Sequence, residues 1–309
     1  MELEFVRWLT KRLPPHPRLR IGPGDDAALL ELAAGEGVVV TADLLIDGVH
    51  FLASETALER IGHKCLAVNL SDLAAMAARP LAAVVSLALP RDGVSGIGPR
   101  ETAAQLIEGM LPLCERLEVC IAGGDTNVHA GPLVVAVTAL GESTPHGVLR
   151  RDGAKPGDAL LVTGSLGGSL LGKHLDFTPR CEEALRLADS YTLHAGMDLS
   201  DGLSMDLPRL AAASGVGAVV EAAAIPMSDD AHEAAARSGR TPIDHALGDG
   251  EDFELLLAVV ADEAERMLAE APLACGLTRI GEVVAERGIF LQGAEGKRTP
   301  LEAAGYEHR

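Results

Sequence analysis

The residues most able to do chemistry in this chain are acidic, and they recur beside glycines. Asp25 and Asp26 follow a Gly-Pro-Gly turn in "IGPGDDAALLEL", and Asp125 follows Gly123 and Gly124. Carboxylate oxygens without matched lysines or arginines are typical ligands of hard divalent ions such as Mg²⁺. Glycines beside them let backbone N–H groups approach phosphate oxygens closely. The pattern therefore predicts a site for a metal ion and a nucleotide.

Asp72 stands inside an apolar helical run, "AVNLSDLAAMAA", between Leu70 and Leu73. Burying an unpaired carboxylate costs several kcal/mol, and no cationic residue lies three or four positions away. A cation ligand is therefore predicted, with a single polar residue on an exposed stripe as the alternative. The other acids near turns or strand ends are Asp43, Asp198 and Asp201 in "DLSDG", and Asp249, Glu251 and Asp252 in "GDGEDFELL".

Three further patterns carry weaker predictions. The segment "GGSLLGKH" (167–174) approaches a Walker A loop, but His174 replaces the Ser or Thr that ligates Mg²⁺, so a glycine-rich turn from strand to helix is favoured. EF-hand loops beginning at Asp198 or Asp43 fail, because Arg209 and Ser54 stand where Glu is required. Taken locally, His50 is interpreted as a packed or turn histidine.

Strands and helices alternate along the chain, which predicts an α/β protein. A region near 145–157 concentrates Gly, Pro and charge, which predicts an N-terminal domain over 1–146 and a C-terminal domain over 147–309. The expected strands are a buried strand over 37–46, strands over 80–90, 132–142 and 217–222, and "EVCIAGGDT" as a strand ending in a turn. The expected helices cover 57–78, 100–118, 181–191 and 204–214.

Composition restricts the class of protein. The formal net charge of −19 argues against nucleic acid and anionic membranes as partners. A phosphorylated substrate would need bound cations to approach so acidic a chain. Asp72 and Arg79 interrupt the longest apolar stretch, and five scattered cysteines without CxxC spacing are typical of reduced core residues. A soluble, cytoplasmic protein is predicted.

Together these motifs resemble the thiamine-monophosphate kinase family, whose superfamily includes aminoimidazole-ribotide synthetase and selenophosphate synthetase. The matching segments follow the family order along almost the whole chain. They are "GDDAALL", "TADLLIDGVHF", "KCLAVNLSDLAAMAARP", "GGDT", "RDGAKPGDALLVTG", "HLDFTPR", "DLSDGL", "GDGEDFEL" and "GYEH".

The resemblance implies transfer of the γ-phosphoryl group of ATP to the phosphate of thiamine monophosphate, which gives thiamine diphosphate. It implies direct in-line transfer assisted by several Mg²⁺ ions. No general base is expected, because the acceptor is already an anionic phosphate oxygen. The implied fold has an N-terminal α/β domain, whose sheet pairs with a second copy in a homodimer, and a C-terminal α/β domain. ATP and Mg²⁺ are expected in the cleft between the domains.

The resemblance also assigns site residues, and it replaces the local interpretation of His50. Implied metal ligands are Asp26, Thr41, Asp43, Asp72, Asp125, Asp198 and Asp201; implied ATP contacts are Gly124, Asp125, Arg151 and Ser200. His50 and Glu251 are expected to touch the thiamine phosphate molecule, and Tyr306 or Phe51 to stack on its rings. Asp25 is interpreted as a turn residue or as one that supports a metal ligand without touching the metal.

The chain departs from the family pattern at a few positions. Ala42 stands where a Thr is usual, Ala303 replaces an aromatic residue, Arg309 replaces a terminal Phe, and "HLDFTPR" lacks one proline. The last three bear on the acceptor rather than on the metal and ATP. Two alternatives therefore stay open. One is a sister ATP-dependent enzyme with another acceptor, and the other is a non-catalytic homologue that binds nucleotide or metal.

Overall fold

A computed structural model describes residues 8, 11–21, 29–30, 32 and 37–305 of the chain. Contacts divide it into two compact units, Met1–Leu73 with Ala78–Pro145 and Ala74–Ala77 with His146–Arg309. Among the described residues, no helix is long and apolar enough to span a membrane. The cysteines are free, and all but Cys275 are buried, which confirms them as core residues.

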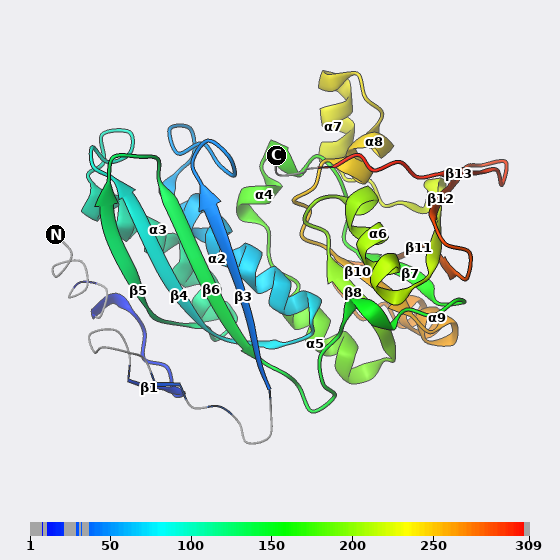
Figure 1. The fold of residues 1–309 in the computed structure, drawn as a ribbon, viewed down its shortest axis with the longest axis horizontal. Helices are drawn as coiled ribbons and strands as arrows, with labels where there is room; N and C mark the ends of the chain where they lie inside the picture. Colours follow the sequence, from blue (N-terminus) through cyan, green and yellow to red (C-terminus); the bar gives the residue numbers. More distant parts are fainter. Residues whose placement is uncertain (1–7, 9–10, 22–28, 31, 33–36, 306–309) are drawn as a thin grey trace. The chain divides into compact units, whose positions relative to one another are not determined.

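The N-terminal unit is built on a four-stranded sheet whose strand order is β3-β6-β4-β5. Only β4 and β5 run parallel; the other pairs are antiparallel. Two helices, α2 and α3, cover one face of this sheet (Figure 1). The bounds are β3 Val38–Ile46, α2 Leu58–Ala75, β4 Arg79–Pro90, α3 Pro99–Arg116, β5 Cys120–His129 and β6 Val134–Glu142, with a small sheet of β1 Leu19–Ile21 and β2 Leu29–Leu30.

Helices α2 and α3 approach each other through two glycines. A Cβ on Gly62 of α2 would lie 1.9 Å from the carbonyl oxygen of Leu106. A Cβ on Gly109 of α3 would lie 1.8 Å from the carbonyl oxygen of Glu59. Because glycine has no side chain, the backbones of the two helices touch at the crossing. This contact fixes the position of α2.

The strand over 37–46 was predicted to be buried, and this prediction is wrong. β3 is an edge strand with one open face, on which Val38, Val40 and Leu44 are 45%, 58% and 54% exposed. Leu45 on the other face is 4% exposed, beneath the helices. Apolar residues occupy both faces of β3, so the alternation that identifies a half-exposed strand is missing from the sequence.

The segment "EVCIAGGDT" was predicted to end in a turn, and this is also wrong. β5 continues through Asp125 to His129 and stays paired with β4 along its length. Gly124 allows a close approach here, because a Cβ on it would lie 1.7 Å from the carbonyl oxygen of Val85. Asp125 therefore lies within a strand.

The C-terminal unit is built on a seven-stranded sheet in the order β13-β12-β9-β11-β7-β10-β8, in which β9 and β12 are the parallel pair. Leu203, Leu207 and Leu210 of α6 pack into the main core with residues of β7, β8, β9 and β10. The strands are β7 Ala159–Thr163, β8 Leu193–Asp198, β9 Gly217–Glu221, β10 Leu255–Val259, β11 Leu277–Val284, β12 Ile289–Gln292 and β13 Arg298–Pro300. The helices are α4 Lys173–Asp176, α5 Cys181–Ser190, α6 Leu203–Ser214, α7 Asp229–Ser238, α8 Pro242–Gly248 and α9 Ala261–Glu270, with 3₁₀ turns at Arg151–Gly153, Ser169–Leu171 and Ala222–Ala224.

Two sheets with helices packed against them confirm the predicted α/β class. The predicted division after residue 146 assigns a function to each domain, and it stays a prediction.

The glycine crossing gives a test of the fold. Gly62→Ala should lower the free energy of unfolding by ~1–3 kcal/mol, because overpacked atoms must displace a backbone carbonyl. Urea unfolding followed by circular dichroism measures this. Gly293→Ala is the control, since a Cβ there meets nothing within 4 Å. Equal midpoints for the two variants would show that α2 and α3 are not in contact at Gly62.

Candidate functional site

Three of the predicted metal ligands meet on the covered face of the N-terminal sheet. Thr41 and Asp43 are two residues apart on β3, so both side chains point toward the helices. Asp72 lies on α2, and Thr41 Oγ1 donates a hydrogen bond to Asp72 Oδ2 at 2.5 Å. All three residues are half-buried.

Asp43 is in an environment unfavourable to its charge. Burial, and then the charge of Asp72, raise the pKa of Asp43 to about 6. Among the described residues its Oδ2 atom is buried without a hydrogen-bond partner. A divalent cation would supply both the missing ligand and the missing positive charge. Two carboxylates and a hydroxyl are oxygen donors of the kind Mg²⁺ takes, so these residues fit that ion.

Among the described residues of the N-terminal unit, Thr41, Asp43 and Asp72 are the predicted metal ligands that meet here. Within the described part of the chain, no three His, Cys, Asp or Glu side chains converge on a point that could hold a metal ion. The predicted ligand Asp26, its neighbour Asp25 and the predicted stacking residue Tyr306 lie outside the described residues.

Asp125 is not brought to this cluster. It lies on β5, the edge strand opposite β3, and two strands separate them. At a spacing of about 4.8 Å between strands, the edges are ~14 Å apart. The strand register places Asp125 in line with Ser86, Ala136 and Leu44, and therefore on the open face of the sheet.

The Asp125 side chain is exposed and well hydrogen-bonded. It accepts hydrogen bonds from Thr126 N and Asn127 Nδ2, each at 2.9 Å. Gly124 precedes it at the close approach to β4.

His50 follows β3, and its ring is held by the backbone. Its Nδ1 accepts a hydrogen bond from Ile46 N at 3.0 Å, so the neutral ring carries its proton on Nε2. Lys64 of α2 is fully buried and donates from Nζ to the His50 carbonyl at 2.8 Å. Lys64 is not among the residues predicted from the sequence, although a lysine in the apolar run "HKCLAVNL" is a signal for it.

The neighbouring Phe51, expected as a possible stacking residue, is 5% exposed and belongs to the core. It is therefore unavailable to stack on a ligand ring, and that expectation is wrong.

In the C-terminal unit, the two acidic turns lie side by side. β8 ends at Asp198, which pairs with Leu255 at the start of β10. Glu251 N donates to Ser200 O at 2.6 Å, which fastens the turn 248–252 to the turn 198–202. The structure thus brings together four predicted site residues: Asp198, Ser200, Asp201 and Glu251.

Asp201 is already paired with a cation. Arg209 of α6 donates from Nη1 to Asp201 Oδ2 at 2.5 Å and to Asp206 Oδ1 at 2.7 Å. Asp206 is fully buried, burial raises its pKa to about 6, and its Oδ2 accepts from Asp201 N at 2.9 Å. To bind a metal through Oδ2, Asp201 would have to exchange Arg209 for the ion. From the sequence, Arg209 was noted only as the residue that breaks an EF-hand.

Arg151 lies on an exposed 3₁₀ turn beside the strand that ends at Asp198. Its carbonyl accepts from Ser214 Oγ at 2.7 Å, and the preceding carbonyl, of Arg150, accepts from Gly196 N of β8 at 3.0 Å. These contacts fix the backbone of Arg151 and leave the side chain at the surface.

Glu251 has a backbone conformation that is uncommon for its residue type. Its φ is +53°, and Phe253, two residues later, has a φ of +50°. Left-handed residues other than glycine are sparse, and they cluster at functional sites. The Phe253 ring stacks on Phe177 of "HLDFTPR" with centroids 4.1 Å apart.

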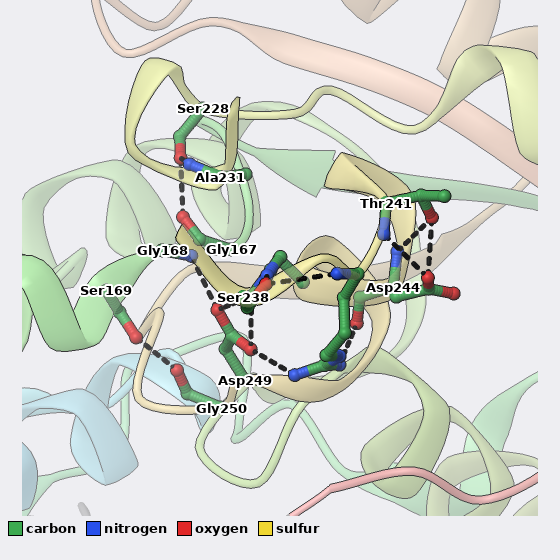
Figure 2. A network of polar contacts seen from close by, with 12 residues as sticks. Gly167, Gly168, Ser169, Ser228, Ala231, Ser238, Thr241, Asp244, Asp249 and Gly250 are labelled. Atoms are coloured by element: carbon green, nitrogen blue, oxygen red, sulfur yellow. Dashed lines mark hydrogen bonds and ion pairs between the residues drawn. The ribbon is translucent and has the colours of Figure 1, made fainter. Parts of the chain in front are cut away.

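The donor groups of the glycine turn 167–169 form hydrogen bonds with other residues of the chain. Gly168 N donates to Asp249 Oδ2 at 3.0 Å, and Ser169 Oγ donates to Gly250 O (Figure 2). Gly167 N donates to Asp252 Oδ1 at 2.9 Å. In a P-loop these N–H groups would face phosphate. The contacts support the interpretation as a strand-to-helix turn and show what it does: it supports the turn that carries Glu251.

A cavity of about 750 Å³ lies elsewhere in the N-terminal unit, between residues 12–18 and the facing ends of α3, β4 and β5. Of the predicted site residues that the structure describes, none lines this cavity.

Comparison with known proteins identifies the family. The N-terminal domain model of AIR synthase related proteins matches residues 24–143, and the corresponding C-terminal domain model matches residues 155–294. A thiamine-monophosphate kinase of Rhodopirellula baltica is 41% identical over 100% of this chain and 97% of its own length.

Two solved structures share the fold. The thiamine-monophosphate kinase of Stenotrophomonas maltophilia is 36% identical, covers 96% of each chain and superposes with a TM-score of 0.78. A structure of AaThiL complexed with AMPPCP and TMP is 27% identical, covers 99% of this chain and 96% of that one, and has a TM-score of 0.77. The chain belongs to the thiamine-monophosphate kinase family of phosphotransferases, within the superfamily of AIR synthase related proteins.

Proposed function

We propose that this chain transfers the γ-phosphoryl group of ATP to the phosphate of thiamine monophosphate, which gives thiamine diphosphate and ADP. The observation that carries the proposal is the pair of half-buried carboxylates, Asp43 and Asp72, with Asp43 Oδ2 left without a partner among the described residues. The relative solved with an ATP analogue and TMP supports the choice of substrates.

Several Mg²⁺ ions are part of this proposal. When bound, they neutralise negative charge on the phosphates and on the protein's carboxylates. Thr41 keeps Asp72 oriented by its hydrogen bond, and Asp43 presents the unpartnered oxygen. The proposed ligands are Asp26, Thr41, Asp43, Asp72, Asp125, Asp198 and Asp201, and the proposed ATP contacts are Gly124, Asp125, Arg151 and Ser200.

Transfer is proposed to be direct and in line. The acceptor oxygen is already anionic, so the chain has to position the two phosphates and needs no group to remove a proton. His50, with its proton on Nε2, suits an anionic phosphate oxygen. Glu251 suits the positively charged or amino-bearing part of thiamine, because a carboxylate would repel phosphate. Tyr306 is proposed to stack on the thiamine rings.

A homodimer is proposed because Asp125 and the carboxylate cluster lie apart within the described part of one copy. Asp125 lies on the edge strand opposite Thr41 and Asp43, on an open face lined by Val38, Val40 and Leu44. An edge strand with an apolar open face invites pairing with another chain. We infer that Asp125 of one copy meets the carboxylate cluster of the other.

Under the same proposal, residues 1–146 form the ATP, Mg²⁺ and dimerisation domain, and residues 147–309 form the C-terminal domain. The reduced cysteines support a location in the cytoplasm.

The reaction is tested directly by incubating the chain with ATP, Mg²⁺ and thiamine monophosphate. Thiamine diphosphate and ADP should appear in equal amounts, as measured by chromatography. ADP formed only with another acceptor would assign the chain to a sister activity. Nucleotide binding without turnover would make it a non-catalytic homologue. Either result overturns the proposed function.

The metal site has a test that does not require activity. Saturating Mg²⁺ should raise the melting temperature of the wild-type chain, since a ligand at a hundred times its Kd adds about 2.7 kcal/mol to the free energy of unfolding. Asp43→Asn should raise the metal-free melting temperature by relieving repulsion with Asp72, and it should lose the increment from Mg²⁺.

Asp92→Asn, at an exposed position of the same unit, is the matched control and should keep that increment. The account of the cluster is wrong if Asp43→Asn responds to Mg²⁺ as fully as this control does.

The shared site predicts complementation between two inactive variants. Asp43→Asn and Asp125→Asn homodimers should each be inactive. A heterodimer of the two, isolated with a different affinity tag on each chain, should recover about half of the wild-type activity. One of its two sites then has both residues intact. An inactive heterodimer would place Asp125 in the site of its own copy, and a monomer at working concentration would remove the dimer altogether.

A further inference from the structure

The turn that carries Glu251 is held in an unusual shape from two sides. Gly250, Glu251 and Phe253 all have positive φ, at +73°, +53° and +50°. This region is unfavourable for residues other than glycine, so the surroundings must impose the conformation. On one side, the backbone N–H groups of Glu251 and Phe253 donate to the carbonyls of Ser200 and Leu199, at 2.6 and 2.8 Å.

The other side is formed by the glycine turn 167–169. Asp249 and Asp252 flank Glu251. The carboxylate of Asp249 accepts from Gly168 N (Figure 2). The carboxylate of Asp252 accepts from Gly167 N. Asp252 is 1% exposed. The three bonds to this turn, including the one from Ser169 to Gly250, bracket Glu251 along the chain.

A second row of side chains holds Asp249 in place. His245 Nδ1 lies 2.8 Å from Asp249 Oδ2, Ser238 Oγ lies 2.7 Å from His245 Nε2, and Arg240 Nη1 donates to Asp249 Oδ1 at 3.2 Å (Figure 2). A neutral His245 with its proton on Nδ1 satisfies both neighbours, because it donates to Asp249 and accepts from Ser238.

The order Ser238–His245–Asp249 resembles a nucleophilic triad, but its location argues against that chemistry. Ser238 is the last residue of α7. The carbonyl end of a helix carries a partial negative charge, which disfavours the oxyanion that attack by serine would produce. Arg240 N also donates to Ser238 Oγ at 3.2 Å, so the hydroxyl is tied into the turn between the helices. The row is therefore a support for Asp249.

We propose that Asp249 and Asp252 are positioning residues, which hold Glu251 toward the thiamine moiety by fastening its turn to the glycine turn 167–169. The inference rests on the proposed function of Glu251 and goes beyond it. It makes the acceptor site depend on two carboxylates that do not face the substrate. It also gives "GGSLLGKH" a role in acceptor binding without any contact to phosphate.

Substitutions of Asp252 can distinguish the effect of its hydrogen bond with Gly167 N from the effect of its negative charge. Burial, the largest effect, raises the pKa of Asp252 to about 7. A neutral amide at this position is therefore a mild change. Asp252→Asn keeps an oxygen that can accept from Gly167 N, whereas Asp252→Ala removes it and leaves a buried N–H unsatisfied.

The test compares steady-state kinetics of Asp252→Ala, Asp252→Asn and Asp249→Ala. Both alanine variants should raise the KM for thiamine monophosphate by about tenfold or more, with the KM for ATP within about twofold of wild type. Asp252→Asn should stay within about threefold for both substrates.

Asp158→Ala is the matched control. Asp158 is a buried carboxylate of the same unit that also accepts a turn amide, from Lys155 N at 2.7 Å. It should lower the melting temperature and leave the KM for thiamine monophosphate unchanged. Three results would each overturn the proposal: Asn as damaging as Ala, equal rises in both KM values, or no rise at all.

Amide hydrogen exchange tests the hydrogen bonds of Asp249 and Asp252 with the glycine turn, even if the proposed function is wrong. In the wild type, the N–H groups of Gly167 and Gly168 should be protected. Asp252→Ala should release the first and Asp249→Ala the second, and Asp252→Asn should keep both protected. If the wild type does not phosphorylate thiamine monophosphate, the function of Glu251 is wrong, while this exchange pattern still reports on the turn. Unchanged protection in both alanine variants would contradict the positioning role directly.

Discussion

Repulsion between Asp43 and Asp72 is the interaction on which the N-terminal unit depends. Asp43 lies on the edge strand β3, and Asp72 lies on α2. The position of α2 is fixed because its backbone contacts that of α3 at Gly62 and Gly109. Burial, and then the charge of Asp72, raise the pKa of Asp43, and one of its oxygens remains without a partner among the described residues. A fold selected for stability alone would relieve this strain with an apolar residue or a lysine. Retaining it makes sense if a cation completes the cluster.

In the C-terminal unit, by contrast, several acidic side chains are already paired with cationic side chains or backbone amides. Asp201 is paired with Arg209, and Asp252 accepts from a backbone amide. Glu254 receives bonds from Arg180, at 2.7 Å from both Nε and Nη2, and from Lys173 at 2.9 Å. Asp201 and Asp252 hold the turns 198–202 and 248–252 in shape, and Glu251 lies within the second of these turns. The acidic motifs thus contain carboxylates that are paired within the C-terminal unit, and one, Asp43, with an oxygen that has no partner among the described residues.

Much of this organisation was predictable from sequence, because local chemistry determines it. Carboxylates beside glycines, and Asp72 within an apolar helix, pointed to the acidic sites without any coordinates. The edge position of β3 was not predictable, since Val38, Val40 and Leu44 look the same in a buried strand. The face on which Asp125 lies depends on strand register and on how far β5 continues, and a Gly-Gly pair gives no sign of that. Bonds between Asp249 or Asp252 and the glycine turn link residues about 80 positions apart, so no spacing rule reveals them.

The claim that a cation completes the carboxylate cluster can be examined by replacing Mg²⁺ with Mn²⁺. Crystals of the wild-type chain grown with Mn²⁺ and a non-hydrolysable ATP analogue would be measured at the manganese absorption edge. The account predicts an anomalous peak within coordination distance of Asp43 Oδ2 and an oxygen of Asp72, with Asp125 of a second copy facing the same nucleotide. Bound nucleotide with no anomalous peak at Asp43 would contradict it.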